Sequence, residues 1–293
     1  MSSAGTLEKT SLTVGALAVA DDAPLYLAIK EGYFRQEGLT VTAVPVAQST
    51  EAIPDMLRGS VDVVTGNYVS FFEAEAKGVV SFKVLVDATH CVPNTFGVMT
   101  LPSSGIRHPA QLAGKTVAVN LTGNVQTLTL DTVLKADRIN PSAVRYVVVP
   151  FPDMLAALKA HRVDAVSVIE PYITAGKATL GTVGVVSQCA GPTAGFPLSG
   201  YFATTSWTQR YARTARAFQA AMAKAQALAD SDPAAVRAIL PTYTKITPKA
   251  AAVLRLNTYP PALTAAQLQP VADLMFSAGM LKSPLPASSL IMP

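Results

Sequence analysis

The feature that most limits how this chain can fold is a repeated alternation of short apolar strands with helices. Residues 12–19 (LTVGALAV) alternate apolar residues with small or polar ones, the pattern of a half-buried strand, and a second strand is predicted at 39–46. Between them a helix is predicted to begin at Asp22, as the N-cap, with Pro24 in its first turn. Asp21 and Asp22 are therefore expected on a turn at the carboxyl end of a strand, where open α/β sheets bind ligands.

The alternation continues along the chain and changes only in the last third. More strands are predicted at 61–66, 81–88, 95–100, 115–120 and 145–149, with helices between them. This order predicts parallel sheets covered by helices. From Ser206 the chain is predicted to be helical, and its proline-rich end is expected on the surface. One apolar stripe with helical spacing consists of Tyr211, Ala215, Phe218, Met222, Ala225 and Ala229.

Size and composition exclude several classes of protein. The chain has 293 residues, half of them hydrophobic and 14% charged, which is enough for two cores, and two lobes are predicted. The net charge is +4 but the Lys and Arg residues are scattered, so nucleic acid is not expected as a partner. No run of 18 apolar residues is present, so no membrane span is predicted.

Catalytic and metal motifs are also missing from the sequence. The three histidines, His90, His108 and His161, do not have the spacing of metal ligands, and Ser167 and Ser199 have no evident His partner. No phosphate-binding or dinucleotide-binding glycine motif occurs. We therefore predict no enzyme activity, no metal and no cofactor.

Five segments, in order and at the expected spacing, resemble the extracytoplasmic solute-binding proteins of ABC importers. These segments are APLYLAIKEGYFRQEGLTV, MLRGSVDVVTGNY, GIRHPAQLAGKTVAVNLTGNVQTLTLDTVLKADRI, MLAALKAHRVDAVSVIEPY and DPAAVRAIL. The subgroup they resemble handles nitrate, sulfonates, taurine, aminopyrimidines and riboflavin. The resemblance implies a type II periplasmic-binding-protein fold, α/β in class, with two α/β lobes joined by two crossover strands. It implies that residues 1–92 and 197–293 form lobe one, and that residues 93–196 form an inserted lobe two.

The resemblance also implies a ligand site in the cleft between the lobes, built from turns that follow the strands. A helix start near Asn124 favours an anion or a carbonyl-like acceptor. The alternative for Asp22, Asn67 and Glu170 is that each only caps a helix, and for Tyr68 and Tyr172 that they only pack between elements. The candidate ligand-binding residues are Asp21, Asp22, Thr65, Asn67, Tyr68, Gly123, Asn124, Val125, Glu170, Tyr172 and Phe196.

The residue types in these turns indicate what the solute is. Three carboxylates and no arginine lie there, and buried carboxylates without a partner are costly, so they are expected to find donors on the ligand. We therefore predict a small polar or heterocyclic solute of the aminopyrimidine, flavin-like or sulfonate class. The closing motion is expected to be a hinge between the lobes.

The two cysteines are far apart in sequence but fall near the two crossover segments of the implied fold. Cys91 and Cys189 either form a disulfide that ties these segments together or remain two buried thiols. The resemblance further implies a monomer that delivers its solute to an ABC permease in the membrane. It implies an extracytoplasmic protein, periplasmic or anchored to the cell surface as a lipoprotein, whose export segment is absent from this sequence. The competing interpretation is an enzyme or ligand sensor on the same fold that acts on a heterocyclic metabolite.

Overall fold

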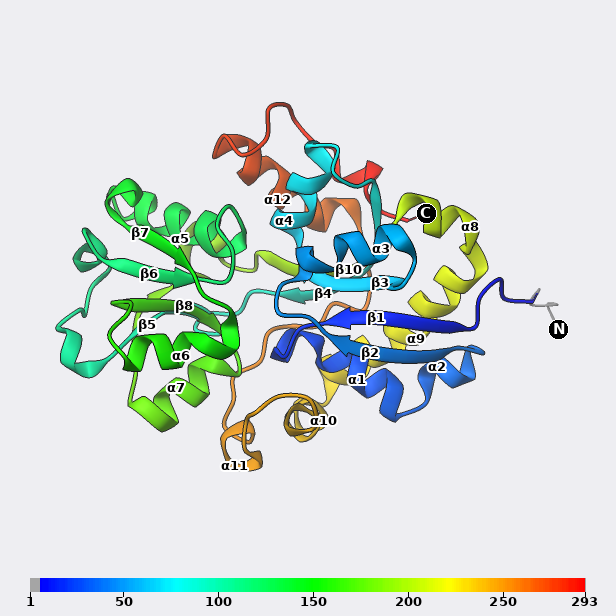
Figure 1. Ribbon diagram of the computed structural model, residues 1–293, viewed down its shortest axis with the longest axis horizontal. Helices are drawn as coiled ribbons and strands as arrows, with labels where there is room; N and C mark the ends of the chain where they lie inside the picture. The colour runs from blue at the N-terminus through cyan, green and yellow to red at the C-terminus, as the bar shows by residue number, and fades with distance from the viewer. Residues whose placement is uncertain (1–5, 293) are drawn as a thin grey trace.

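The computed structural model describes residues 6–292, and its strands form two separate five-stranded sheets (Figure 1). The first sheet has the order β2-β1-β3-β10-β4 and the second has the order β7-β6-β8-β5-β9. The strands of the first sheet are β1 (Ser11–Ala16), β2 (Thr40–Pro45), β3 (Val63–Asn67), β4 (Phe82–His90) and β10 (Pro197–Thr204). Those of the second are β5 (Phe96–Thr100), β6 (Thr116–Val119), β7 (Arg145–Val148), β8 (Ala165–Ile169) and β9 (Val183–Ser187).

The alternation of strands and helices predicted parallel sheets, but both sheets are mixed. In the first sheet β1 pairs in parallel with β2 and β3, but β10 is antiparallel to both β3 and β4. In the second sheet β5 is antiparallel to β8 and β9. β5 and β10 are each the first strand that the chain forms after it crosses from the other sheet. The chain enters the new sheet from the side of the crossing, so each of these strands runs opposite to its neighbours.

Helices cover both faces of the first sheet. The long helix α9 (Ala212–Ser231) packs with α1 (Ala23–Lys30) and α2 (Tyr33–Gln36) on one face, and it buries Ala215, Phe218, Met222, Ala225 and Ala229 of the predicted stripe. The other face carries α3 (Ile53–Arg58), α4 (Tyr68–Ala76) and α12 (Ala265–Ser277). The remaining helices of the carboxyl-terminal third are α8 (Thr205–Arg210), α10 (Pro233–Ile239) and α11 (Pro248–Ala251).

The second sheet has its own helices and its own two hydrophobic clusters. The helices are α5 (Val125–Ala136), α6 (Phe151–Lys159) and α7 (Tyr172–Leu180). One cluster contains Met154 and Ile173 from α6 and α7, and the other contains Leu130 and Leu134 from α5. Each sheet therefore has a core of its own, and we refer to the two units as the first and the second lobe.

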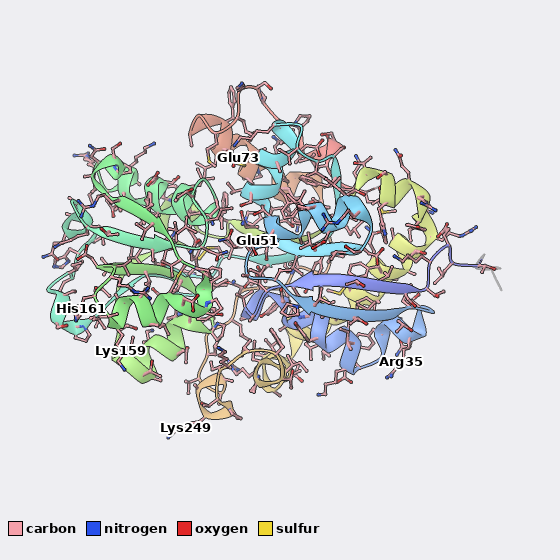
Figure 2. All side chains as sticks on the ribbon, viewed as in Figure 1. Arg35, Glu51, Glu73, Lys159, His161 and Lys249 are labelled. Atoms are coloured by element: carbon pink, nitrogen blue, oxygen red, sulfur yellow. A yellow bond between two sulfur atoms is a disulfide. The ribbon has the colours of Figure 1, made fainter. Side chains whose placement is uncertain are left out.

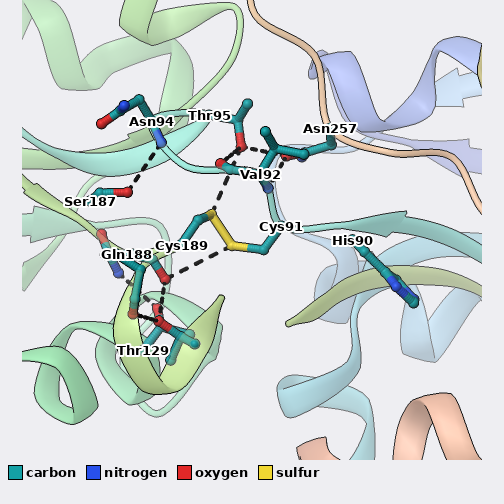
Figure 3. The surroundings of a disulfide bond; sticks show 12 residues. His90, Cys91, Val92, Asn94, Thr95, Thr129, Ser187, Gln188, Cys189 and Asn257 are labelled. Atoms are coloured by element: carbon teal, nitrogen blue, oxygen red, sulfur yellow. Dashed lines mark hydrogen bonds between the residues drawn. A yellow bond between two sulfur atoms is a disulfide. The ribbon is translucent and has the colours of Figure 1, made fainter. Parts of the chain in front are cut away.

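The chain crosses between the lobes in two segments, 91–95 and 188–196, and a disulfide joins them. Cys91 and Cys189 are bonded, with their Cα atoms 5.3 Å apart (Figure 3). Beside the disulfide, the hydroxyl of Thr95 lies 3.8 Å from the Cys189 sulfur and Asn94 N donates to the Ser187 hydroxyl. Two chain crossings that are held together by a covalent bond form a short joint between the lobes.

Most of the proline-rich end lies on the surface as predicted, but its last residues pair with the first sheet. Val84 N donates to Leu290 O (2.7 Å) and Met292 N donates to Val84 O (3.2 Å), so residues 290–292 extend the edge of the first sheet beyond β4. Leu290 and Met292 are buried there. Their apolar side chains explain the difference, because an edge strand offers both backbone partners and a core to pack against.

Candidate functional site

The carboxyl ends of strands from both sheets meet at one cavity of about 60 Å³ between the lobes, here called the cleft cavity. The first lobe contributes the segment after β1, the end of β3 and part of β10, and the second lobe contributes the turn after β6 and the starts of α5 and α6. Five predicted site residues line it: Asp21, Asp22, Asn67, Asn124 and Val125. The position agrees with the rule that such sheets bind ligands at the carboxyl ends of their strands.

Six predicted site residues lie outside the lining of the cleft cavity. Tyr68 is fully buried in the first lobe and donates to Asp87 Oδ1 (2.7 Å), so it acts as a packing residue. Phe196 is in the same core, and Tyr172 stacks behind Phe151, which does line the cavity (ring centroids 5.6 Å apart). The other three are Thr65, Gly123 and Glu170.

Asp22 occupies the N-cap position of α1 as predicted, but its side chain makes no capping hydrogen bond. Its Oδ2 instead accepts hydrogen bonds from Leu17 N (2.6 Å) and from the hydroxyl of Thr65 (2.8 Å). Burial raises the pKa of Asp22 to about 8, and the neighbouring Asp21 adds to this rise while the two hydrogen bonds oppose it. Asp22 is therefore largely protonated at neutral pH and can present a hydroxyl donor at the cavity.

Asp21 connects the site to the joint between the lobes. Its Oδ2 accepts from the hydroxyls of Thr89 on β4 (2.9 Å) and Ser199 on β10 (3.3 Å), and its Oδ1 accepts from Asn257 Nδ2 (3.0 Å). Asn257 in turn accepts from Val92 N and from the Thr95 hydroxyl in the first crossing segment. Burial raises the pKa of Asp21 as well, although its three donors oppose the rise.

These contacts correct the argument that the acids need donors from a ligand. The donors to Asp21 and Asp22 come from the protein itself. With their pKa values raised, the two acids also repel an anion less than a count of carboxylates suggests.

Two of the proposed capping roles are present. Asn67 Oδ1 accepts from Ser70 N (2.9 Å) at the start of α4. Glu170 accepts from both the backbone N and the hydroxyl of Thr174 (3.0 and 2.9 Å) in the first turn of α7. Glu170 faces a different hollow from the cleft cavity, whereas Asn67 keeps its side chain at the cavity wall.

The turn before α5 is held rigid by a network of amide side chains. Asn124 Oδ1 caps the helix by accepting from Gln126 N (3.0 Å) and Thr127 N (3.3 Å). Gln126 Oε1 accepts from Asn120 N (2.6 Å), and its Nε2 donates to Ser167 O (2.7 Å) on β8. Gly123 has φ +64°, a conformation that favours glycine, and lies opposite Glu73 of the first lobe.

Asn120 is the most informative site residue that the sequence analysis missed. Its side chain is buried and lines the cleft cavity, and its Oδ1 has no hydrogen-bond partner among residues 6–292. A buried amide without a partner costs free energy unless another molecule bonds to it. Asn120 is a polar residue at the end of a strand that was predicted to be apolar, and this position could have marked it as a candidate site residue. Other missed lining residues are Ser49, Gln126, Phe151 and Ser199.

Two hydrogen bonds cross from one lobe to the other beside the cleft cavity. Gln48 Nε2 donates to Asn120 O (2.9 Å), and Ala20 N donates to Glu170 O (2.9 Å). A cavity of about 60 Å³ is well below the roughly 300 Å³ of a small ligand pocket. The two hydrogen bonds join the lobes beside this small cavity.

Metal and membrane features give no further site in the part of the chain that the structure describes. Residues 6–292 contain no group of three His, Cys, Asp or Glu side chains arranged to hold a metal ion. None of their helices combines the length and apolar character needed to cross a membrane.

Two lobes, each an α/β unit, joined by two crossings with a cavity between strand ends, define the periplasmic-binding-protein fold. Solved structures of this fold match almost the whole chain. The alkanesulfonate-binding protein SsuA from Xanthomonas axonopodis pv. citri, bound to MOPS, has a TM-score of 0.79 at 17% identity, covering 98% of this chain and 99% of that chain. The ligand-binding component of an ABC-type import system from Staphylococcus aureus reaches 0.81 at 17% identity, covering 97% of both chains. The nitrate-binding protein NrtA from Synechocystis PCC 6803 reaches 0.80 at 14% identity, covering 97% of this chain and 86% of that chain.

The family is given by a sequence model rather than by these structures. The model described as NMT1/THI5 like matches residues 20–236, about three quarters of the chain, and the chain belongs to that family. No curated protein matches the sequence.

Proposed function

We propose that this protein is the extracytoplasmic solute-binding component of an ABC importer, which captures a small solute in the cleft cavity and passes it to a membrane permease. The observation that carries the proposal is the buried cavity at facing strand ends, with the unpaired Asn120 amide in its wall. Membership of the NMT1/THI5 like family and the fold of the alkanesulfonate- and nitrate-binding proteins support this role. The disulfide is in keeping with an oxidising compartment.

The lining of the cleft cavity supports a neutral polar solute such as an aminopyrimidine or flavin-like heterocycle. No Lys or Arg of the described residues lines it, so an anion would meet no cationic side chain. Apart from Asp21 and Asp22, the polar side chains at the wall are amides and hydroxyls, including those of Ser49, Asn67 and Asn120, and Phe96 and Phe151 offer apolar faces. A solute with several hydrogen-bonding groups on a planar body matches this set.

A sulfonate is the second candidate, and one feature favours it. The amino-terminal end of α5, a helix of 12 residues, lies at the cavity wall, where Val125 is part of the lining. Backbone N–H groups at a helix start attract an anion, and the helix dipole adds to this attraction. The two candidates differ in charge and can be separated by a binding screen.

The proposed function is tested by a thermal-shift and calorimetry screen of aminopyrimidines, flavins, sulfonates and nitrate. A solute present at about a hundred times its dissociation constant stabilises the folded protein by about 2.7 kcal/mol, which raises Tm by several degrees. Asn120→Ala should weaken binding of that solute about tenfold to a hundredfold, because it loses a hydrogen bond in a buried site. Asn140→Ala, which removes an exposed asparagine of the same lobe, should leave binding unchanged.

The enzyme alternative is tested with the same samples. The bound solute, released by denaturing the protein after a long incubation, should be recovered chemically unchanged. Conversion of a heterocycle to a new product by the wild-type protein, lost in Asn120→Ala, would favour an enzyme and refute the carrier role.

A further inference from the structure

A second and much larger hollow lies beside the cleft cavity, on the other side of the turn that follows β8. It has a volume of about 1030 Å³ and runs between α7 and β9 of the second lobe and the segment 247–255, which contains α11. We call it the α7–α11 groove. Ile169 faces the cleft cavity and Glu170 faces the groove, while Phe96 borders both. The groove is therefore a separate site, at the upper end of the size range of small-molecule pockets.

Basic residues outnumber acidic ones along the groove. Its basic residues are Lys177 on α7 and Lys249 and Arg255 on the opposite wall, and all three are exposed. Lys249 projects from α11 at the lower edge of the molecule (Figure 2). Within residues 6–292 none of the three lies within 4.0 Å of a carboxylate. A concave surface lined by cations of this kind concentrates anions from solution.

The one acidic residue in the described lining does not offset these charges. Glu170 is 5% exposed, and both of its oxygens accept hydrogen bonds from Thr174. Burial raises the pKa of Glu170, while the hydrogen bonds from Thr174 and the charge of Lys177 oppose the rise. The groove keeps a net positive character.

The rest of the lining combines apolar residues with the polar residues Asn94, Thr174, Ser187 and Thr247. Met99, Ile173 and Val185 form part of the second-lobe wall, and Val253, which is 77% exposed, stands on the opposite wall. A large apolar side chain with this exposure gains free energy when a ligand covers it, at roughly 25 cal/mol per Å² of apolar surface. Cations and apolar surface on facing walls suit a molecule that has one anionic end and one apolar end.

We propose that the α7–α11 groove binds a small amphipathic anion, separate from the solute in the cleft cavity. Its carboxylate or sulfonate head contacts Lys177, Lys249 and Arg255, and its apolar body packs against the exposed Ala178 and Val253. Both walls contribute, so the site requires the second lobe and the segment 247–255 together.

The test uses sodium octanesulfonate as the probe, measured by isothermal titration calorimetry on the whole protein. It should bind to the wild-type protein, and the affinity should fall as salt is added, because exposed charges are screened. The triple variant Lys177→Gln/Lys249→Gln/Arg255→Gln should bind at least tenfold more weakly. The control variant Lys30→Gln/Lys135→Gln/Lys159→Gln loses the same total charge from exposed positions outside the groove and should bind as the wild type does.

Two further measurements locate the probe. Ala178→Trp adds a large side chain at an exposed position in the groove and should block binding of octanesulfonate without changing the circular dichroism spectrum. Octyltrimethylammonium, which has the same chain and the opposite charge, should not bind. The proposal is overturned by absence of octanesulfonate binding, by equal binding of the cationic probe, or by binding that survives both groove variants and disappears in Asn120→Ala.

Discussion

Burial sets the charge of the two acids at the centre of the molecule. Asp21 and Asp22 are adjacent in sequence and both nearly inaccessible, so each carboxylate loses hydration, and Asp21 also opposes the ionisation of Asp22. Their five donors are hydroxyl, amide and backbone groups, none of them a cation. Without a positive partner, the neutral form of Asp22 is favoured up to a pH of about 8.

This assignment predicts how stability depends on pH. Because the pKa of Asp22 is higher in the folded chain than in the unfolded one, folding takes up a proton between these values, and stability is lost as the pH rises toward 8. The slope for one such group is about 1.4 kcal/mol per pH unit. Asp22→Asn resembles the protonated form, so its free energy of unfolding should fall less than that of the wild type between pH 5 and pH 8. Urea unfolding at both pH values measures the difference.

A comparison with Asp131 checks that the effect is specific. Asp131 is half-buried, its pKa is also raised, and it accepts from the Tyr146 hydroxyl far from the cleft cavity. Asp131→Asn should leave most of the pH dependence in place. If Asp22→Asn and the wild type lost stability in parallel over this range, Asp22 would be ionised throughout, and the account of its burial would be wrong.

Sequence patterns located the site turns but not the direction of each side chain. Asp21, Asn67 and Asn124 line the cleft cavity as predicted, because the end of a parallel strand fixes where the next residues lie. Tyr68 follows the same strand as Asn67 yet points into the core, where its hydroxyl donates a hydrogen bond to Asp87. That partner lies 19 residues away in sequence, so no local pattern could reveal it.

At the scale of elements, the two crossings and the segment around Asn257 act as one joint. Asn257 is in the carboxyl-terminal part of the chain, and its amide bonds both to Asp21 in the site and to Val92 in the first crossing. The disulfide lies next to this contact, with Thr95 between the sulfur of Cys189 and the oxygen of Asn257 (Figure 3). Hydrogen bonds through Asp21, Asn257 and Thr95 therefore connect the cleft cavity to the joint.

Asn257→Ala should destabilise the protein and loosen this joint. The substitution leaves Asp21 Oδ1 and Val92 N without a partner, while the Thr95 hydroxyl keeps its bond to Val92 O, and partly buried groups left unpaired cost about 1–3 kcal/mol. Urea unfolding measures the loss. Thr258→Ala, at the next and more exposed position, should have little effect, and an equal loss in the two variants would contradict the role of Asn257.

The disulfide should contribute strongly to stability because it closes a long loop. Cys91 and Cys189 are 98 residues apart, and removal of a native disulfide typically costs 2–5 kcal/mol. Cys91→Ala/Cys189→Ala should lose about that much free energy of unfolding and should no longer respond to reductant. Thiol titration of the unfolded, unreduced wild-type protein should detect no free thiol, and two free thiols would refute the bond.

The order of elements was predictable because each local pattern agrees with its environment, as in α4, which lies between the strands predicted at 61–66 and 81–88. Reversal of β10 and β5 was not predictable from periodicity, since a strand has the same pattern in either direction. The pairing of residues 290–292 with β4 was missed for a related reason. Prolines marked the segment as irregular, and only the tertiary structure supplies the exposed strand edge on which it docks.

At the scale of the whole molecule, the proposed function depends on the relative position of two lobes that each have their own core. Few hydrogen bonds cross the cleft cavity, so the free-energy difference between closed and open arrangements is expected to be a few kcal/mol. A solute shifts this balance only if it bonds to both lobes when they are closed. Asn67 of the first lobe and Asn120 of the second face the same cavity and meet this requirement.

The hydrogen bond from Gln48 to Asn120 O offers a direct test of hinge closure. Gln48→Ala removes an interaction that exists only when the lobes are together, and one such bond is worth about 1 kcal/mol, or about fivefold in the closed-to-open ratio. The variant should show a larger radius of gyration in small-angle scattering and an affinity for the cleft solute reduced by a similar factor. Glu51→Ala is the matched control, because Glu51 is exposed in the same segment (Figure 2). Identical scattering from Gln48→Ala and wild type, together with unchanged affinity, would mean that this contact does not control closure.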